Sequence, residues 1–239
     1  MVRFMKQLMH AFVAVFSLVG VPVAGAGESI DTLIERTIVT YGGAAIPARG
    51  TMFRISGHNW SNQRGAEGAM LRELRWPDYL RVEITYEDGG RETRLLVGDE
   101  GWWDGAPASG PLVAAMKLQA ARLALPMLLR WEAKRVRDMG DALRDDGVEV
   151  RRLHVDLGDG LSLFVEIDVH SARILRSAGV MTMGGLEMSF GAEFGDFRSF
   201  GALSWPGRED QSAMGQKTGW SVIEVIEVNL SLERDALHP

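Results

Sequence analysis

Alternating apolar and polar residues, the pattern of a half-buried β-strand, recur along most of this chain. In the clearest early example, residues 80–86, Leu80, Val82, Ile84 and Tyr86 share one face. The sequence EDGG that follows predicts a tight hairpin turn, because such turns need positive φ. Further strands are predicted over residues 51–57, 69–76, 92–97, 148–157, 161–169, 173–183, 186–197, 199–205 and 222–230, with a polar loop over 207–219. The pattern therefore predicts a mainly β protein.

A short amphipathic helix is predicted before the first strand. Apolar residues recur at spacings of three and four between Ile30 and Tyr41, so one helical face is apolar. Ser29 suits the N-cap. Gly42 and Gly43 end the helix, because glycine adopts the left-handed C-terminal conformation without steric cost. We expect this helix to pack on a sheet.

A second helical segment, residues 112–131, is apolar almost all round. Pro111 suits its first turn, and Pro126 is expected to kink the helix or divide it in two. A helix with apolar residues on every side must be buried on several sides. In a chain of 239 residues, a bound apolar ligand can supply one of those sides.

Residues 1–26 have the features of a secretory signal peptide. Arg3 and Lys6 precede an apolar stretch, and residues 24–26 (AGA) fit a small-x-small cleavage site. The stretch is shorter than the ~20 residues needed to span a bilayer, so cleavage near Ala26 is favoured over a retained anchor. We predict an exported protein in which residues 27–239 form one domain.

Composition narrows the possible chemistry. The chain has no cysteine, which excludes disulfides, thiol nucleophiles, iron–sulfur clusters and cysteine-ligated zinc. Its formal net charge is −6 and its basic residues do not cluster, so nucleic acid is not an expected partner. The sequence contains no His-Glu-x-x-His, Gly-x-Ser-x-Gly or P-loop motif. We therefore expect no enzyme and no metal or organic cofactor.

One polar pair is a catalytic candidate. Asp168 and His170 share a strand face, but with no nucleophile in view we favour a solvated strand end. Carboxylates far apart in sequence can still converge, as they do in glycosidases. A secreted hydrolase therefore stays an alternative.

The candidate ligand-binding residues come mainly from the apolar helical segment and its surroundings. Arg81 lies on the strand face opposite Leu80 and Val82; a solvent-facing position is favoured, and a cavity arginine that binds a lipid head group is the functional alternative. Trp102 and Trp103 follow a turn and suit either a cavity mouth or the core edge. The candidate residues of a hydrophobic cavity and its lid are Arg81, Trp102, Met116, Leu123, Met127, Leu128 and Trp131.

Six short pieces, taken in their order, resemble the periplasmic lipoprotein-carrier and outer-membrane lipoprotein-sorting superfamily of LolA, LolB and LppX-like proteins. The pieces are YGG at 41–43, LRVE at 80–83, GWW at 101–103, FGDFR at 194–198, GALSWP at 201–206 and VNL at 228–230. Residues 179–185 and 207–219 have no obvious counterpart in the superfamily.

The resemblance implies an incomplete antiparallel β-barrel, or half-barrel, with helices covering its concave face. It also implies a periplasmic carrier that buries the acyl chains of lipids or acylated lipoproteins under a helical lid. Its partners would include membrane donor and acceptor proteins. An envelope-stress or regulatory sensor with the same half-barrel is a second function that the resemblance allows.

Overall fold

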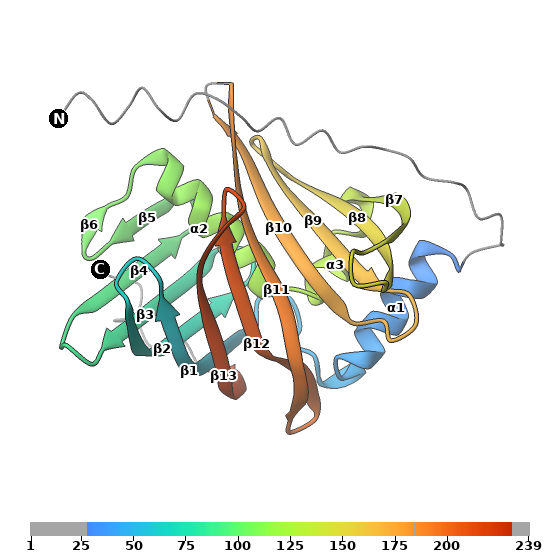
Figure 1. Ribbon diagram of the computed structural model, residues 1–239, viewed down its shortest axis with the longest axis horizontal. Coiled ribbons are helices and arrows are strands. Elements are labelled where there is room, and N and C mark those ends of the chain that lie inside the picture. The colour runs from blue at the N-terminus through green and yellow to red at the C-terminus, as the bar shows by residue number, and fades with distance from the viewer. Residues whose placement is uncertain (1–27, 184, 231–239) are drawn as a thin grey trace.

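The computed structural model describes residues 28–183 and 185–230. The predicted signal peptide over residues 1–26 lies outside this range. The described residues form an antiparallel sheet of 13 strands in the order β6-β5-β4-β3-β2-β1-β13-β12-β11-β10-β9-β8-β7. The sheet is strongly curved and does not close (Figure 1). The predicted mainly β half-barrel with helices is therefore confirmed.

The sheet consists of two meanders that join through the pairing of β1 with β13. The first meander contains β1 (Met52–Ser61), β2 (Ala66–Arg75), β3 (Tyr79–Tyr86), β4 (Arg91–Val97), β5 (Glu100–Trp103) and β6 (Ala106–Pro107). The second contains β7 (Val136–Leu143), β8 (Glu149–Gly158), β9 (Leu161–Asp168), β10 (Ile174–Met183), β11 (Leu186–Phe200), β12 (Leu203–Ala213) and β13 (Gln216–Leu230).

This strand order explains the unusual apolar segment. The strands β6 and β7 follow each other in sequence but occupy opposite edges of the sheet, so the chain between them must cross from edge to edge. It crosses as α2 (Gly110–Leu123), α3 (Met127–Trp131) and a short 3₁₀ helix, η2 (Ala133–Arg135). The division at Pro126 is as predicted. Because α2 contacts β3, β4 and β5 on one side and β9 and β10 on the other, it is apolar on several sides.

The first helix, α1 (Ile30–Thr40), begins and ends where the sequence predicts. The Ser29 hydroxyl accepts a hydrogen bond from the backbone N–H of Thr32, which caps the N-terminus. Gly42 has φ 130°, and a Cβ there would lie 2.8 Å from the Ala202 carbonyl oxygen, so this position requires glycine. A 3₁₀ helix, η1 (Gly43–Ala45), follows.

Tyr41 joins the end of α1 to the sheet. Its ring meets Phe197 and Trp205 edge-on, with centroids 6.0 and 5.4 Å away. Its hydroxyl accepts a hydrogen bond from the backbone N–H of Ile174 on β10. Burial raises the pKa of Tyr41. The YGG piece of the sequence thus lies at a packing joint between α1, β10 and β12.

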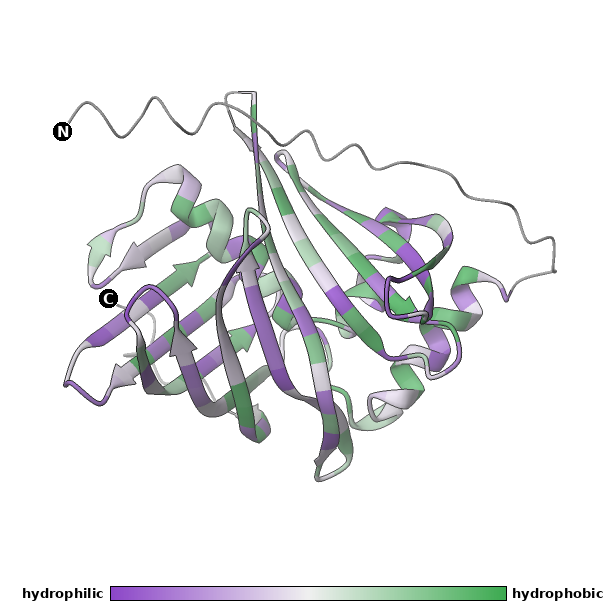
Figure 2. Ribbon diagram, viewed as in Figure 1, coloured by the Kyte–Doolittle hydropathy of each residue, from purple (hydrophilic) through white to green (hydrophobic). Residues whose placement is uncertain are grey.

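The main hydrophobic core lies on the concave side of the sheet, under the helices. Figure 2 shows apolar and polar residues alternating along the strands, as the sequence pattern predicted. Leu80, Val82, Ile84 and Tyr86 all belong to this core, together with buried residues of α1, α2 and α3. A second, smaller cluster of Met52, Tyr79 and Leu95 lies on the other side of the first meander.

Several secondary-structure predictions were wrong. The strand predicted over 199–205 is interrupted by a turn, since β11 ends at Phe200 and β12 starts at Leu203. Residues 207–219 were predicted to be a loop but form most of a hairpin, since β12 runs to Ala213 and β13 starts at Gln216. Both faces of this hairpin carry polar residues, so the alternation that marks a strand is missing. The strand β7 was not predicted because it is a largely exposed edge strand in which apolar and polar residues do not alternate.

Candidate ligand-binding cavity

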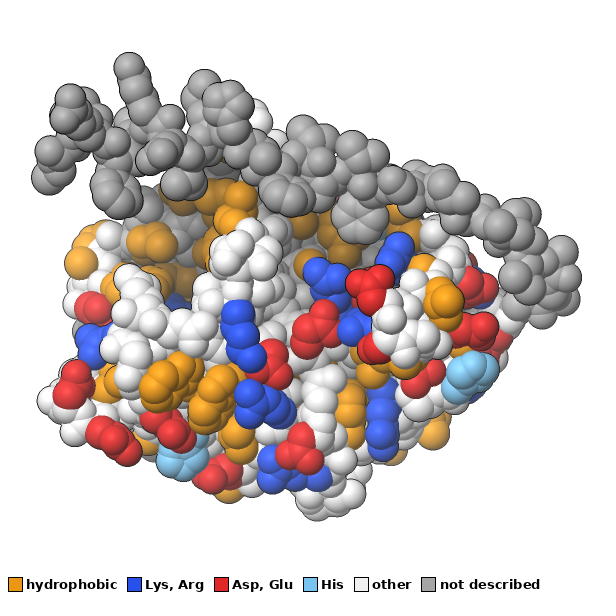
Figure 3. All heavy atoms as spheres, in the orientation of Figure 1, with side chains coloured by type: hydrophobic (Ala, Val, Ile, Leu, Met, Phe, Trp, Pro, Cys, Tyr) orange, Lys and Arg blue, Asp and Glu red, His pale blue; other side chains and the backbone are white. Residues whose placement is uncertain are grey.

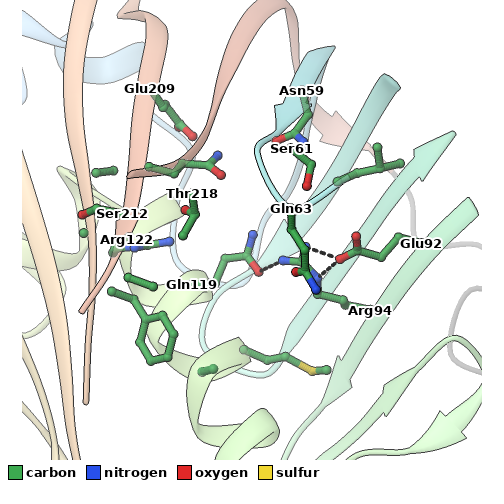
Figure 4. A pocket seen from close by; sticks show the side chains of 18 of the residues that line it. Asn59, Ser61, Gln63, Glu92, Arg94, Gln119, Arg122, Glu209, Ser212 and Thr218 are labelled. Atoms are coloured by element: carbon green, nitrogen blue, oxygen red, sulfur yellow. Dashed lines mark hydrogen bonds and ion pairs between the residues drawn. The ribbon is translucent and has the colours of Figure 1, made fainter. Parts of the chain in front are cut away.

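A cavity of about 770 Å³ lies between α2 and the concave face of the sheet. One wall comes from β1 to β5, the other from β10 to β13, and α2 forms the third side. This volume is within the ~300–1,000 Å³ range of small-molecule sites. The lining combines an apolar part with a cluster of charged and amide side chains (Figure 4).

The apolar part of the lining is rich in methionine and aromatic residues. It comprises Ile84, Trp103, Leu112, Met116, Leu123, Met181, Met188, Phe190 and Phe194. Methionine is unbranched and polarizable, so it can repack around apolar chains of varied shape. This wall therefore suits flexible hydrocarbon.

A buried ion pair forms the centre of the polar part. Arg72 Nη1 lies 2.6 Å from Glu209 Oε2, and the two side chains are only 4% and 8% exposed. Arg72 Nη2 donates to Ser221 Oγ at 2.7 Å, and Ser221 Oγ also bonds Gln211 and Asn59. The network takes residues from four adjacent strands, β2, β1, β13 and β12, and so ties the two meanders together where they meet.

The guanidinium of Arg94 on β4 is held by side-chain partners from β4, α2 and β5. It pairs with Glu92, and its Nη1 donates to Gln119 Oε1 of α2 at 3.0 Å. Its guanidinium carbon lies 4.9 Å from the centre of the Trp103 ring, within the range of a cation–π contact. These contacts attach α2 to the first meander.

Arg122 differs from the other two arginines. It extends from α2 into the cavity, and Figure 4 draws hydrogen bonds for Arg94 and Gln119 but not for Arg122. Within residues 28–183 and 185–230, no hydrogen bond or ion pair to its guanidinium is found. Burial lowers the pKa of Arg122 to about 10, with Glu209 opposing this shift and Arg72 and Arg94 adding to it. The site thus contains an arginine without a bonded anion.

Some of the predicted site residues line the cavity and others are buried in the core. Met116 and Leu123 line the cavity. Met127 and Leu128 are almost completely buried in the core below it, and Trp131 packs against that core, so these three do not line the cavity. All three belong to α3, whose buried side chains pack into the core.

Arg81 and Trp102 lie on the opposite face of the sheet from the cavity. Arg81 pairs with Glu83, and Trp102 packs on the small cluster that contains Tyr79. Their inclusion among the cavity residues is therefore corrected, and Arg81 takes the solvent-facing position that the sequence favoured. Strand parity is the reason: a shift of one residue reverses the face, so Trp103 reaches the cavity instead of Trp102.

The polar centre of the cavity was not predicted, although its signals are present in the sequence. Arg72 lies between Met70 and Leu74 on the inward face of β2, where a charge interrupts an apolar series. On α2, Gln119 and Arg122 are three residues apart and so share one helical face. A charged residue at an inward position of an apolar pattern was therefore the sequence feature that could have predicted this polar centre.

The polar pair of Asp168 and His170 stabilises a turn. Asp168 accepts hydrogen bonds from the backbone N–H of His170 and from the hydroxyl of Ser171. The His170 ring faces Glu149 at 3.5 Å. Across the described part of the chain, no group of three or more His, Asp or Glu side chains is placed to hold a metal ion.

The comparisons with known proteins identify the fold. No protein-family model matches the sequence, and no curated protein matches it. A crystal structure of a LolA superfamily protein from Nitrosomonas europaea superposes with a TM-score of 0.50, at 10% identity, over 89% of this chain and 98% of that one. The chain therefore has the fold of the LolA superfamily, as the resemblance predicted.

Two further structures are similar at lower scores. An outer-membrane lipoprotein-sorting protein domain from Vibrio parahaemolyticus matches with a TM-score of 0.48, at 11% identity, over 87% of this chain and 97% of that one. The lipoprotein LppX of Mycobacterium tuberculosis matches at 0.29 and 12% identity, over 86% and 99% of the two chains. Among the helices of the described segments, none is long and apolar enough to cross a bilayer.

Proposed function

We propose that this protein is a periplasmic carrier that binds lipids, or the acyl chains of lipoproteins, in the cavity under α2. The observation that carries the proposal is the cavity of about 770 Å³ with a wall of methionine, leucine and phenylalanine side chains. Each buried methylene contributes roughly 0.8 kcal/mol, so the affinity should rise with the length of acyl chain that the cavity buries. The signal-like residues 1–26 support export.

The helix α2 acts as the lid in this proposal. It lies between the two walls, and its contacts with the first meander include two side-chain hydrogen bonds, from Arg94 to Gln119 and from Lys117 to Asp99. On the other wall it packs over Gly179 of β10, where a Cβ would lie only 3.0 Å from Leu118 Cβ. A helix held by few polar bonds can move aside to admit cargo and return afterwards.

The test is native mass spectrometry of the mature protein purified from the periplasm of its own host, followed by lipid extraction. We expect a stoichiometric acyl-bearing adduct. Ala115 lines the cavity from α2, so Ala115→Trp should fill the space and remove the adduct. Val39→Trp, at a position that is 69% exposed on α1, is the matched control and should keep it.

Two results would reject the carrier. A clean apo mass, with no uptake of added lipids, would indicate a role in protein interaction, with α2 as ordinary core. An adduct that survives Ala115→Trp in a folded protein would place the lipid elsewhere on the molecule.

A further inference from the structure

The charges around the cavity do not cancel. Four basic side chains line it, from Arg72, Arg94, Arg122 and Lys217, against the two carboxylates of Glu92 and Glu209. Three of the four cations have a carboxylate partner. Arg72 pairs with Glu209, Arg94 with Glu92, and Lys217 with Asp210 at 2.9 Å outside the lining.

Arg122 is the remaining cation. Its side chain is half-buried, and the part that is not covered by protein faces the cavity. A guanidinium held away from bulk water without an anion is costly, because the desolvation is not repaid by an ion pair. Neither Arg72 nor Arg94 depends on Arg122 for a hydrogen bond.

Other polar groups surround the Arg122 guanidinium. In Figure 4 the side chains of Ser212, Thr218 and Gln119 lie around the space that Arg122 enters. Hydroxyl and amide groups can donate hydrogen bonds to an oxyanion that a guanidinium already neutralises. Met116 and Leu123, on the same helix, begin the apolar wall. One cavity therefore offers an anion site and a place for hydrocarbon.

We propose that the cargo is an amphiphile with an anionic head group, a carboxylate or a phosphate, and that Arg122 is the residue that binds this head group. The inference rests on the proposed carrier function and adds the class of ligand to it. Guanidinium binds both oxyanions through paired N–H donors, so the two heads share one chemistry. A neutral head of the same tail length leaves Arg122 unpaired and is bound more weakly.

The test compares three ligands with the same twelve-carbon tail: dodecanoate, dodecyl phosphate and dodecanol. Each displaces a neutral fluorescent naphthylamine probe from the mature protein. We expect the wild type to prefer at least one of the two anions to dodecanol by tenfold or more. Arg122→Gln should abolish this preference and leave the affinity for dodecanol within twofold. Arg122→Lys should restore part of it.

Lys117→Gln is the matched control, because it also removes one positive charge from α2. Lys117 pairs with Asp99 and does not line the cavity, so the control should keep the wild-type preference. A preference for only one of the two anions identifies the head group as carboxylate or phosphate, and either supports the inference.

The failures of the two proposals are distinguishable. If the wild type binds all three ligands equally, the carrier stands and the anion site is wrong. If the wild type binds none of them, both proposals fail. If Arg122→Gln weakens the binding of dodecanol as much as the binding of the anions, Arg122 has a structural role and the inference is overturned. Thermal unfolding of the ligand-free variant gives a second check, since a lower Tm than wild type would also indicate a structural role.

Discussion

The buried pair of Arg72 and Glu209 allows a sharp prediction about stability. These residues lie on β2 and β12, with β1 and β13 between them. Neighbouring strands are about 4.8 Å apart, so in a flat sheet the two strands would be separated by roughly 14 Å. The 2.6 Å contact between their side chains therefore depends on the curvature of the sheet, and we expect the pair to maintain that curvature.

Glu209→Gln removes the charge and leaves Arg72 buried with only neutral side-chain acceptors, the Ser221 hydroxyl and the amide oxygen at position 209. Breaking a buried pair from one side costs ~3–5 kcal/mol. For a domain of this size each kcal/mol lowers Tm by about 2–4 °C, so Tm should fall by roughly 6–20 °C. The double variant Arg72→Met/Glu209→Met should be much less destabilised than either single variant, because it removes both charges.

The assay is urea and thermal unfolding of the mature protein, with a double-mutant cycle of Arg72→Met and Glu209→Met. Arg208→Met is the control on the same strand, where Arg208 pairs with Asp210 and is 39% exposed. This control variant should lower the free energy of unfolding by at most about 1 kcal/mol. A cost below 1 kcal/mol for Glu209→Gln, or additive single variants, would refute the claim that this pair holds the sheet.

Three other changes have clear expected outcomes. Tyr41→Phe removes the hydroxyl that accepts a buried backbone N–H and should cost ~1–3 kcal/mol in urea unfolding; an unchanged midpoint would contradict this. Gly179→Val should force Leu118 and α2 away from β10 and destabilise by about 1–3 kcal/mol, whereas a neutral effect would mean that α2 adapts freely. The hydrogen bond from Arg208 lowers the pKa of Asp210 in the folded protein. The ionised carboxylate therefore stabilises the fold at pH values above its unfolded pKa, and this contribution is lost as the pH falls through the folded pKa. Asp210→Asn should therefore cost up to about 1 kcal/mol at pH 7 and much less at pH 2, and equal costs at both values would exclude the ion pair.

The mainly β class was predictable because period-two alternation survives wherever a strand buries an apolar face, and the half-barrel followed from the family resemblance. Residues 80–86 show this best, since every inward position is apolar and every one belongs to the main core. The hairpin of β12 and β13 was missed because polar residues occupy its inward face. Its inward side carries Glu209 and Gln211 and its outward side carries Arg208 and Asp210, so neither face shows a periodic apolar signal.

The apolar wall of the cavity was partly predictable and the polar centre was not. The all-round apolar character of residues 112–131 correctly indicated a helix buried on several sides, and two of its predicted ligand residues, Met116 and Leu123, line the cavity. The segment could not indicate which face met the core. That depends on the crossing from β6 to β7, which is set by pairing between strands far apart in the sequence.

The polar centre gives a physical reason why the cavity stays open. An apolar groove under a mobile helix would lower its free energy by closing, because contact between the walls buries more apolar surface. Closure here would bury the Arg122 guanidinium further, and burial is already the main cause of its lowered pKa. The cost of desolvating this charge therefore opposes collapse in the empty state, and an anionic head group would offset that cost when cargo enters. The same arginine would keep the cavity available and select what fills it.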